Sequence, residues 1–238
     1  MASLSAQARD KLKLCSAATL TTVLFKRGFR NVFIQGVFAL NRQAPKMVGE
    51  AFTLRYIPAR EDLDQLGAFE GRGHPQREAI EACPPGHVMV MDARRDASAA
   101  TGGDILMTRL MVRGAAGIVT DGGLRDSPTI EQLPWPAYCA ARSAPLNLVR
   151  HHAVESQVPI GCGGVPVYPG DVVVGDQEGV VVIPATIAED VASEAAAQTQ
   201  FEDWVEARVK EGRSIFGLYP PSAETKAEFE AWKVRQGR

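Results

Sequence analysis

Two adjacent charged side chains, Arg125 and Asp126, are the residues whose types and spacing best suit chemistry. They close the segment Asp121-Gly-Gly-Leu-Arg-Asp126, in which two glycines let the backbone turn sharply after a predicted strand. A carboxylate such as that of Asp126 binds a hard divalent cation through oxygen. A guanidinium such as that of Arg125 offers a fixed fork of donors to an enolate or a carboxylate. The alternative is a surface turn whose two charges form a weak ion pair, worth about 0–1 kcal/mol.

A second segment, Gly102-Gly-Asp-Ile-Leu106, opens a predicted helix. The first N–H groups of a helix have no acceptor within it and lie at the positive end of its dipole, so this backbone suits a carboxylate. Taken alone, Asp104 is better explained as an acid that stabilises a first helical turn. The binding interpretation gains weight because this segment and the Arg125–Asp126 turn flank the same β-α-β unit.

The elements expected to position these residues follow one another closely. Residues 102–113 predict a helix that packs on a sheet, Gly114 ends it, and residues 115–120 predict a buried strand. In such β-α-β units, ligands commonly bind at the carboxyl ends of the strands. The segment from Asp121 to Asp126 falls at that point.

The rest of the chain predicts a single α/β domain over residues 1–238, with no linker or internal repeat. His151-His152 is interpreted as a helix end rather than a metal pair, and Cys162 and Trp204 as packing residues. Helices are expected at 7–27, 76–83 and 185–210, and strands at 49–57, 87–92, 165–167, 172–174 and 180–183.

Composition excludes several classes of protein. A hydrophobic fraction of 45% and a charged fraction of 23% are typical of a globular domain. The net charge of −2 and the lack of a dense Lys/Arg block argue against nucleic-acid and membrane-surface partners. Four scattered cysteines without a C-x-x-C pair predict neither a structural zinc site nor a disulfide framework. Because no signal peptide or apolar membrane span is present in the sequence, a cytoplasmic location is expected.

An ordered series of motifs resembles one family. The series is Gly102-Gly-Asp-Ile-Leu106, then Arg113-Gly-Ala-Ala-Gly-Ile-Val119, then Asp121-Gly-Gly-Leu-Arg-Asp126, then Val167-Tyr-Pro-Gly-Asp171, and finally Gly175-Asp-Gln-Glu-Gly179 with Val-Val-Val-Ile-Pro184. It is similar to the 4-hydroxy-4-methyl-2-oxoglutarate and 4-carboxy-4-hydroxy-2-oxoadipate aldolases, a family shared with the RraA-like regulators of ribonuclease E activity. The resemblance is strongest over residues 86–184.

The resemblance implies a swivelling-domain-like α/β/β sandwich with N- and C-terminal helices, assembled as a homotrimer or homohexamer. It also implies that Asp126 supports Mg²⁺ or Mn²⁺ and that Arg125 contacts the substrate's 2-oxo group. The helix and tail from about residue 185 would lie at subunit interfaces, where Glu202 or Glu206 could approach a neighbour's metal; taken alone, both are better explained as solvated acids on a helix face. The residues implied to bind substrate are Gly103, Asp104, Ile105, Leu106 and Arg125.

The leading functional hypothesis is metal-dependent retro-aldol cleavage of a 4-hydroxy-2-oxo acid to pyruvate and a second carbonyl compound. Arg125, Asp126 and Asp104 are the catalytic candidates, with Asp104 aligning a water that takes the C4-hydroxyl proton. Oxaloacetate decarboxylation is expected as a side activity because it passes through the same enolate. One alternative is a non-catalytic protein-binding regulator. Another is a lyase or hydratase acting on sugar-derived 2-oxo acids, since residues 61–76 form a longer insert than compact relatives have.

Overall fold

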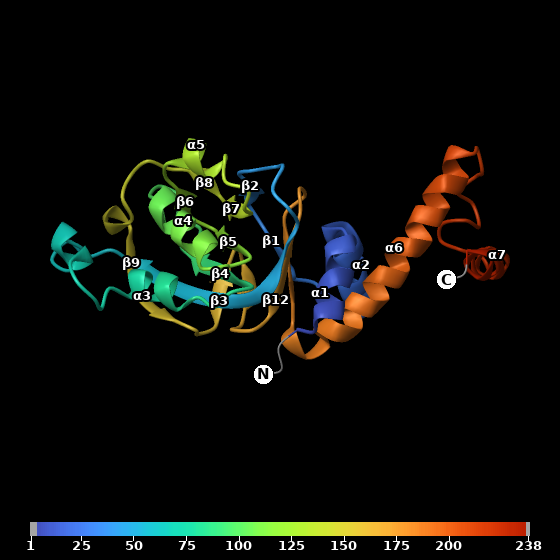
Figure 1. The fold of residues 1–238 in the computed structure, drawn as a ribbon, viewed down its shortest axis with the longest axis horizontal. Helices are drawn as coiled ribbons and strands as arrows, with labels where there is room; N and C mark the ends of the chain where they lie inside the picture. The colour runs from blue at the N-terminus through green and yellow to red at the C-terminus, as the bar shows by residue number, and fades with distance from the viewer. Residues whose placement is uncertain (1–3, 237–238) are drawn as a thin grey trace.

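The computed structural model describes residues 4–236, and its largest element is a curled mixed sheet (Figure 1). Within those residues the strands run in the order β1-β13-β12-β3-β4-β5-β7-β2, with β9 added to the end of β3. The strand bounds are β1 Phe33–Ile34, β2 Phe38–Ala39, β3 Met47–Pro58, β4 His87–Asp92, β5 Gly117–Thr120, β7 Ala137–Cys139, β9 His151–Ser156, β12 Val172–Gly175 and β13 Val180–Ile183. Two small ribbons pair β6 Gly123–Leu124 with β8 Ala141–Arg142, and β10 Ile160–Cys162 with β11 Val165–Val167.

The centre of the sheet is parallel and its flanks are antiparallel. Strands β3, β4, β5 and β7 are parallel neighbours, whereas β12, β13, β1, β2 and β9 join by antiparallel pairing. The register pairs Met91 of β4 with Thr120 of β5, so both strands end at the same edge. The chain segments that follow β4 and β5 therefore start side by side, as the predicted β-α-β unit requires.

The parallel strands are buried on both faces, and their side chains alternate between two hydrophobic clusters. In β4, Met89 and Met91 pack in the cluster under α3 and α4, whereas Val88 and Val90 face the opposite cluster with β10 and β11. The helix bounds are α3 Pro75–Ala82, α4 Asp104–Val112, α5 Ser127–Ile130, and the 3₁₀ turns η1 Leu66–Phe69 and η2 Asn147–Val149. All four cysteines are buried and form no disulfide.

The N-terminal segment forms two helices rather than the single helix predicted over residues 7–27. Helix α1 spans Ala6–Leu14 and α2 spans Ala17–Lys26, with Cys15 and Ser16 extended between them. The Ser16 hydroxyl caps α2 by accepting from the Thr19 N–H at 3.0 Å, and the Ala17 N–H donates to the Asp176 carboxylate at 2.7 Å. A cap and a distant carboxylate thus end the first helix where hydrophobic spacing alone would continue it.

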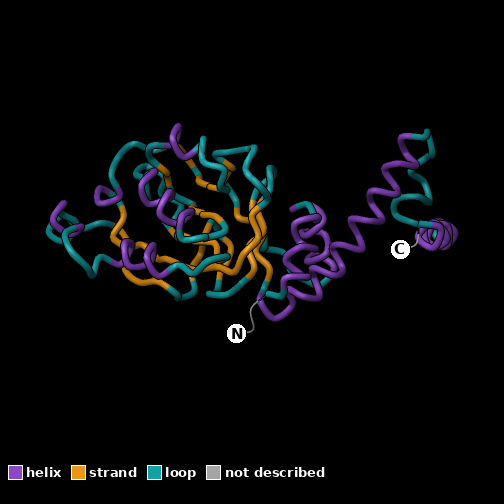
Figure 2. The backbone as a smooth tube through the Cα atoms, in the orientation of Figure 1, coloured by secondary structure: helices purple, strands orange, loops and turns teal. Residues whose placement is uncertain are grey.

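The C-terminal helix α6, Ala188–Lys210, follows the 3₁₀ turn η3, Ala185–Ile187, and packs at its start on α1 and α2. It then leads away from the strands; after its far end the chain turns back, and α7, Ala223–Arg235, packs beside the last turns of α6 (Figures 1 and 2). We call this segment, residues 199–235, the C-terminal arm. Trp204 is buried there against Phe201 and Phe229, which confirms it as a packing residue.

The prediction that His151-His152 ends a helix was wrong, because these residues begin β9. Their strand pairs antiparallel with the last residues of β3, His151 opposite Pro58 and His152 opposite Ile57. This pairing joins distant segments, which local sequence spacing does not reveal. Among the helices within residues 4–236, none combines the length and apolar character needed to cross a bilayer.

Candidate functional site

The structure brings the predicted site residues together around one cavity of about 290 Å³, which we call the Arg125 cavity. The cavity lies at the carboxyl ends of β4 and β5. Helix α4 is the next helix after β4, and the Arg125–Asp126 turn comes after β5. Six predicted residues line it: Gly103, Asp104, Ile105, Leu106, Arg125 and Asp126. Their chemical roles stay predictions, but they share one pocket.

The Arg125–Asp126 turn has a constrained backbone. Asp126 is left-handed, with φ 53° and ψ 29°, and its carbonyl accepts the Thr129 and Ile130 N–H groups that begin α5. Arg125 Nε lies 3.2 Å from Asp126 Oδ2, and both side chains are about two-fifths exposed. An ion pair this exposed adds little stability. The left-handed backbone of Asp126 is uncommon, and the ion pair beside it does little to stabilise the fold. Such conformations are typical of functional sites.

Gly103 is required by the close approach of two chain segments. A Cβ atom at this position would lie 2.6 Å from Asp126 Oδ2 and 3.0 Å from Arg125 Cγ. The Gly103 backbone is extended, with φ −127°, so the requirement is steric rather than conformational. The Arg125 N–H also donates to the Gly102 carbonyl at 3.0 Å. The loop that contains Gly102 and Gly103, which we call the glycine loop, therefore packs closely against the Arg125–Asp126 turn.

The amino end of α4 supplies backbone donors to the same cavity. The N–H groups of the first turn of a helix have no acceptor within it, and they lie at the positive end of the dipole. Asp104 Oδ1 accepts from the Ile105 N–H at 2.7 Å, so this acid acts partly as a local helix-start acceptor. Ile105 is 79% exposed and also lines the cavity.

A buried hydrogen-bond network holds Thr101, the residue just before the glycine loop. Gln76 Nε2 donates to the Thr101 carbonyl at 2.5 Å and to the Tyr56 hydroxyl at 3.0 Å. The Thr101 hydroxyl donates to the Gly123 carbonyl at 3.1 Å and so connects the loop before α4 with the turn after β5. Burial raises the pKa of Tyr56 well above its usual value, so this hydroxyl stays neutral.

The cavity also has walls that the sequence did not indicate. Phe69 and Arg77 line it beside Gln76, with the Arg77 guanidinium 4.5 Å above the Phe69 ring. Asn147 lines it from η2, and its Nδ2 is buried with no hydrogen-bond partner in the described part of the chain. Such a donor costs about 1–3 kcal/mol when unpaired. The only sequence signal was the unusual length of the insert that carries Phe69.

Asp121, the first residue of the charged segment, has a structural role. Its carboxylate is buried and accepts the N–H groups of Ala93, Arg95 and Gly163 at 2.6, 3.1 and 3.0 Å. Burial raises the pKa of this carboxyl group, and the bonds from Gly163 and Ala93 oppose that shift. Asp121 therefore ties β5 to the loop after β4 and to the turn after β10, rather than lining the cavity.

The donors at the cavity fit a hydrated hard cation rather than a fully protein-bound one. Within residues 4–236 no group of three or more His, Cys, Asp or Glu side chains is placed to hold a metal ion. Asp126 and Asp104 nevertheless line one cavity, and Mg²⁺ commonly binds through one or two carboxylates while it keeps several waters. Glu202 and Glu206 do not line this cavity; Glu202 accepts from Thr19 Oγ1 at 2.9 Å, and Glu206 pairs with Lys210 at 2.9 Å.

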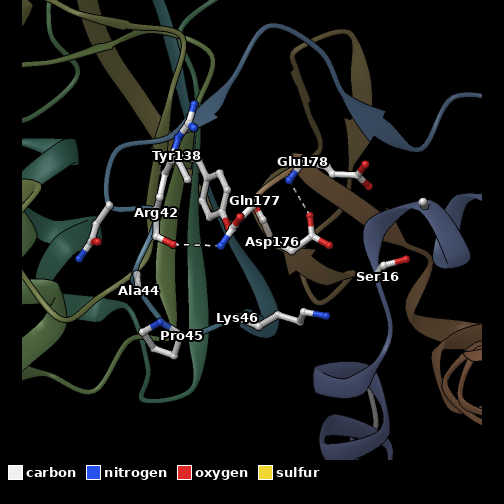
Figure 3. Close-up of a pocket in the computed structure, with 12 residues that line it drawn as sticks. Ser16, Arg42, Ala44, Pro45, Lys46, Tyr138, Asp176, Gln177 and Glu178 are labelled. Atoms are coloured by element: carbon white, nitrogen blue, oxygen red, sulfur yellow. Dashed lines mark hydrogen bonds between the residues drawn. The ribbon is translucent and has the colours of Figure 1, made fainter. Parts of the chain in front are cut away.

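A larger cavity of about 510 Å³ lies between the start of α2 and the loop before β3 (Figure 3). Two of its charged groups are used in structural contacts: Lys46 Nζ donates to the Cys15 carbonyl, and the Asp176 carboxylate accepts from the Ala17 and Glu178 N–H groups. The Tyr138 hydroxyl donates to the Asp176 carbonyl at 2.9 Å. Because these contacts stabilise the two chain segments, we assign no chemistry to this cavity.

Residues 12–182 match the family model described as RraA-like, Aldolase/RraA. The chain belongs to the RraA-like family. A protein of Halalkalibacterium halodurans named "Putative 4-hydroxy-4-methyl-2-oxoglutarate aldolase" is 38% identical over 119 residues, which are 50% of this chain and 56% of that protein. The chain thus spans only about half the length of this curated relative.

Solved structures of RraA-like proteins share the fold. Streptomyces coelicolor RraAS2, described as an unusual member of the RNase ES inhibitor RraA family, aligns with a TM-score of 0.76 and 29% identity, over 87% of this chain and 98% of that one. An uncharacterized protein from Pseudomonas syringae aligns with a TM-score of 0.80 at 24% identity, over 92% and 95% of the two chains. The swivelling-domain-like, RraA-like α/β fold expected from the motif series is confirmed.

Proposed function

We propose that this chain is a divalent-metal-dependent carbon–carbon lyase that cleaves a 4-hydroxy-2-oxo acid to pyruvate and a second carbonyl compound. One observation supports the proposal: Arg125, Asp126 and the residues that open α4 line the same cavity. The aldolase name of the Halalkalibacterium relative supports the same reaction class.

Each group at the cavity has a distinct task in this reaction. The backbone donors of residues 103–106 bind the C1 carboxylate of the substrate. The Arg125 guanidinium faces the C2 oxygen and stabilises the negative charge that develops there as the enolate forms. Asp104 orients a water that accepts the C4-hydroxyl proton as the C3–C4 bond breaks, and a proton returned from this water to C3 of the enolate gives pyruvate. Because the enolate is stabilised electrostatically, the reaction needs no Schiff base from a lysine.

The cofactor in this proposal is Mg²⁺ or Mn²⁺, held by Asp126 with water completing its coordination. When bound, such an ion supplies Lewis-acid polarisation of a substrate oxygen. Oxaloacetate decarboxylation belongs to the proposal as a side activity, because it also generates the enolate of pyruvate.

The test follows pyruvate formation from a panel of 4-hydroxy-2-oxo acids with Mg²⁺, with Mn²⁺ and with EDTA. We expect EDTA to abolish turnover, and Arg125→Ala and Asp126→Ala to lower kcat about 100-fold or more, because each change removes stabilisation of the developing charge. Arg142→Ala is the matched control, since Arg142 also forms an exposed acid pair, with Glu131 at 3.1 Å, but does not line the Arg125 cavity. Turnover that is indifferent to EDTA and to both substitutions would contradict the proposal.

A second candidate is a non-catalytic regulator that binds another protein. The structural match to RraAS2, a member of an RNase ES inhibitor family, favours it. This function predicts a stoichiometric protein partner and no pyruvate release in any metal condition.

A third candidate, a lyase or hydratase of sugar-derived 2-oxo acids, is favoured by Phe69, because the insert places this ring in the cavity wall. The pyruvate assay separates the first candidate from the other two, and a pull-down that looks for a stoichiometric protein partner separates the second from the third.

A further inference from the structure

One wall of the Arg125 cavity contains a buried polar group that folding alone does not explain. Asn147 is 4% exposed, it is the first residue of η2, and its Nδ2 has no hydrogen-bond partner within residues 4–236. Buried amide groups in proteins are nearly always hydrogen-bonded, because losing water without gaining a partner is unfavourable. A leucine would fill this position without that penalty.

The backbone around Asn147 fixes the position of this amide. The Ala100 N–H donates to the Pro145 carbonyl at 2.9 Å, which ties the loop before η2 to the loop before α4. The Arg150 N–H donates to the Asn147 carbonyl at 2.9 Å and closes the 3₁₀ turn. Gln76, which is also buried and lines the cavity, differs because its Nε2 donates to both Thr101 and Tyr56. Gln76 is therefore structural, whereas the Asn147 donor is left for a ligand.

We propose that Asn147 Nδ2 donates a hydrogen bond to an oxygen of the substituent on C4, distinct from the C4 hydroxyl itself, on the part of the substrate that leaves as the second carbonyl product. This inference rests on the proposed function, in which residues 103–106 and Arg125 already bind the pyruvate half. Asn147 comes from a different segment, and Phe69 and Arg77 complete the lining. The partner oxygen belongs to a carboxylate or a hydroxyl group, the acceptors that an amide N–H serves. Asn147 thereby discriminates between substrates, because a tail without an oxygen leaves this donor unpaired.

The experiment compares Asn147→Leu with the unchanged protein on three 4-hydroxy-2-oxo acids, which carry a methyl, a hydroxymethyl or a carboxylate group on C4. A second assay measures exchange of pyruvate methyl protons with deuterium oxide by NMR, which reports on the pyruvate half alone. We expect kcat/KM to fall about tenfold or more for oxygen-bearing tails, with little change for the methyl tail or for proton exchange. A loss confined to the carboxylate or to the hydroxymethyl substrate identifies the oxygen that Asn147 binds.

The control is Val149→Ala in the same 3₁₀ turn, because Val149 is 60% exposed and does not line the cavity. Thermal unfolding adds a second readout: Asn147→Leu should keep or raise the Tm, since it removes an unpaired buried donor. Equal losses on all three substrates, an equal loss of proton exchange, or a lowered Tm with unchanged selectivity would overturn the role of Asn147. An unchanged protein that neither exchanges nor cleaves would instead overturn the proposed function, and this inference with it.

Discussion

At the scale of single residues, the Arg125 cavity depends on glycines, because a Cβ atom at these positions would collide with neighbouring residues. Gly103 provides the room that the Asp126 carboxylate and the Arg125 stem occupy, and Gly123 similarly lacks the Cβ that would lie 2.4 Å from Ser143 Cβ. These positions could not carry a side chain without moving a neighbour. Gly103 therefore sets the distance between the two segments that carry charge, and Gly123 sets the distance between the turn after β5 and Ser143.

The first residue-scale prediction concerns Gly103→Ala. The added Cβ displaces Asp126 Oδ2 and the Arg125 side chain, so we expect kcat to fall about 100-fold. Stability should change by less than about 1 kcal/mol, because the Gly103 backbone is extended and the displaced groups are side chains near solvent. Steady-state kinetics and urea unfolding measure the two effects.

The matched control for this substitution is Gly161→Ala in β10, where a Cβ would meet nothing within 4 Å. It should leave both kinetics and stability near the unchanged values. A Gly103→Ala protein with full activity would show that the fit between the glycine loop and the charged turn is irrelevant to the reaction.

At the scale of elements, strand β9 supports the loop that leads into α4. His151 at the start of β9 is buried, with Nε2 3.2 Å from the Ala99 carbonyl and Nδ1 3.1 Å from Arg94 Nη2. These partners fit a neutral imidazole that donates through Nε2–H and accepts through Nδ1. Burial lowers the pKa of His151, and the nearby Arg94 acts in the same direction.

This arrangement predicts a pH dependence of stability. Between the usual histidine pKa of about 6.5 and the lower pKa of folded His151, the unfolded chain binds the proton and the folded chain does not. The free energy of unfolding should therefore fall as the pH is lowered through this window. His151→Gln keeps a donor and an acceptor without titrating, so it should reduce the slope; urea unfolding from about pH 7.5 to about pH 5 checks this. A variant with the unchanged slope would contradict the prediction.

At the scale of the whole molecule, the C-terminal arm is the part least covered by the rest of the chain (Figure 1). Its inner side is packed by Trp204 and Phe229, but Ile215, Phe216 and Tyr219 are 54%, 90% and 49% exposed. Neighbouring exposed apolar side chains commonly mark a protein interface. We therefore predict that the arm contacts a second copy of this chain, in the homotrimer or homohexamer expected from the resemblance.

The corresponding prediction is a mass in solution of three or six times 25.6 kDa, measured by size-exclusion chromatography with light scattering. Phe216→Asp should shift the assembly toward smaller species because it places a charge on the exposed apolar surface. Phe216 is 90% exposed within the chain, so the fold itself should tolerate the change. A monomeric protein would contradict the predicted oligomer and leave Glu202 and Glu206 without a neighbouring site to approach.

The sequence by itself determined those features whose causes are local. Strand β4 was predicted with the bounds found in the structure, and the glycine pairs and the Arg125–Asp126 turn were placed at the ends of the correct elements. Hydrophobic periodicity, glycine conformation and helix-end chemistry act over a few neighbouring residues. A parallel β-α-β unit then brings consecutive strand ends to one edge, so the convergence of residues 103–106 and 125–126 was predictable.

Only the tertiary structure decided the features that depend on distant partners. Asp176 places the start of α2, β3 pairing makes His151 part of a strand, and the insert and η2 bring Phe69 and Asn147 to the cavity. No local pattern shows that an asparagine is buried without a partner, since burial and hydrogen bonding depend on which remote segments surround it. Sequence neighbours therefore set the side of the Arg125 cavity formed by residues 103–106 and 125–126, and long-range packing sets its other wall.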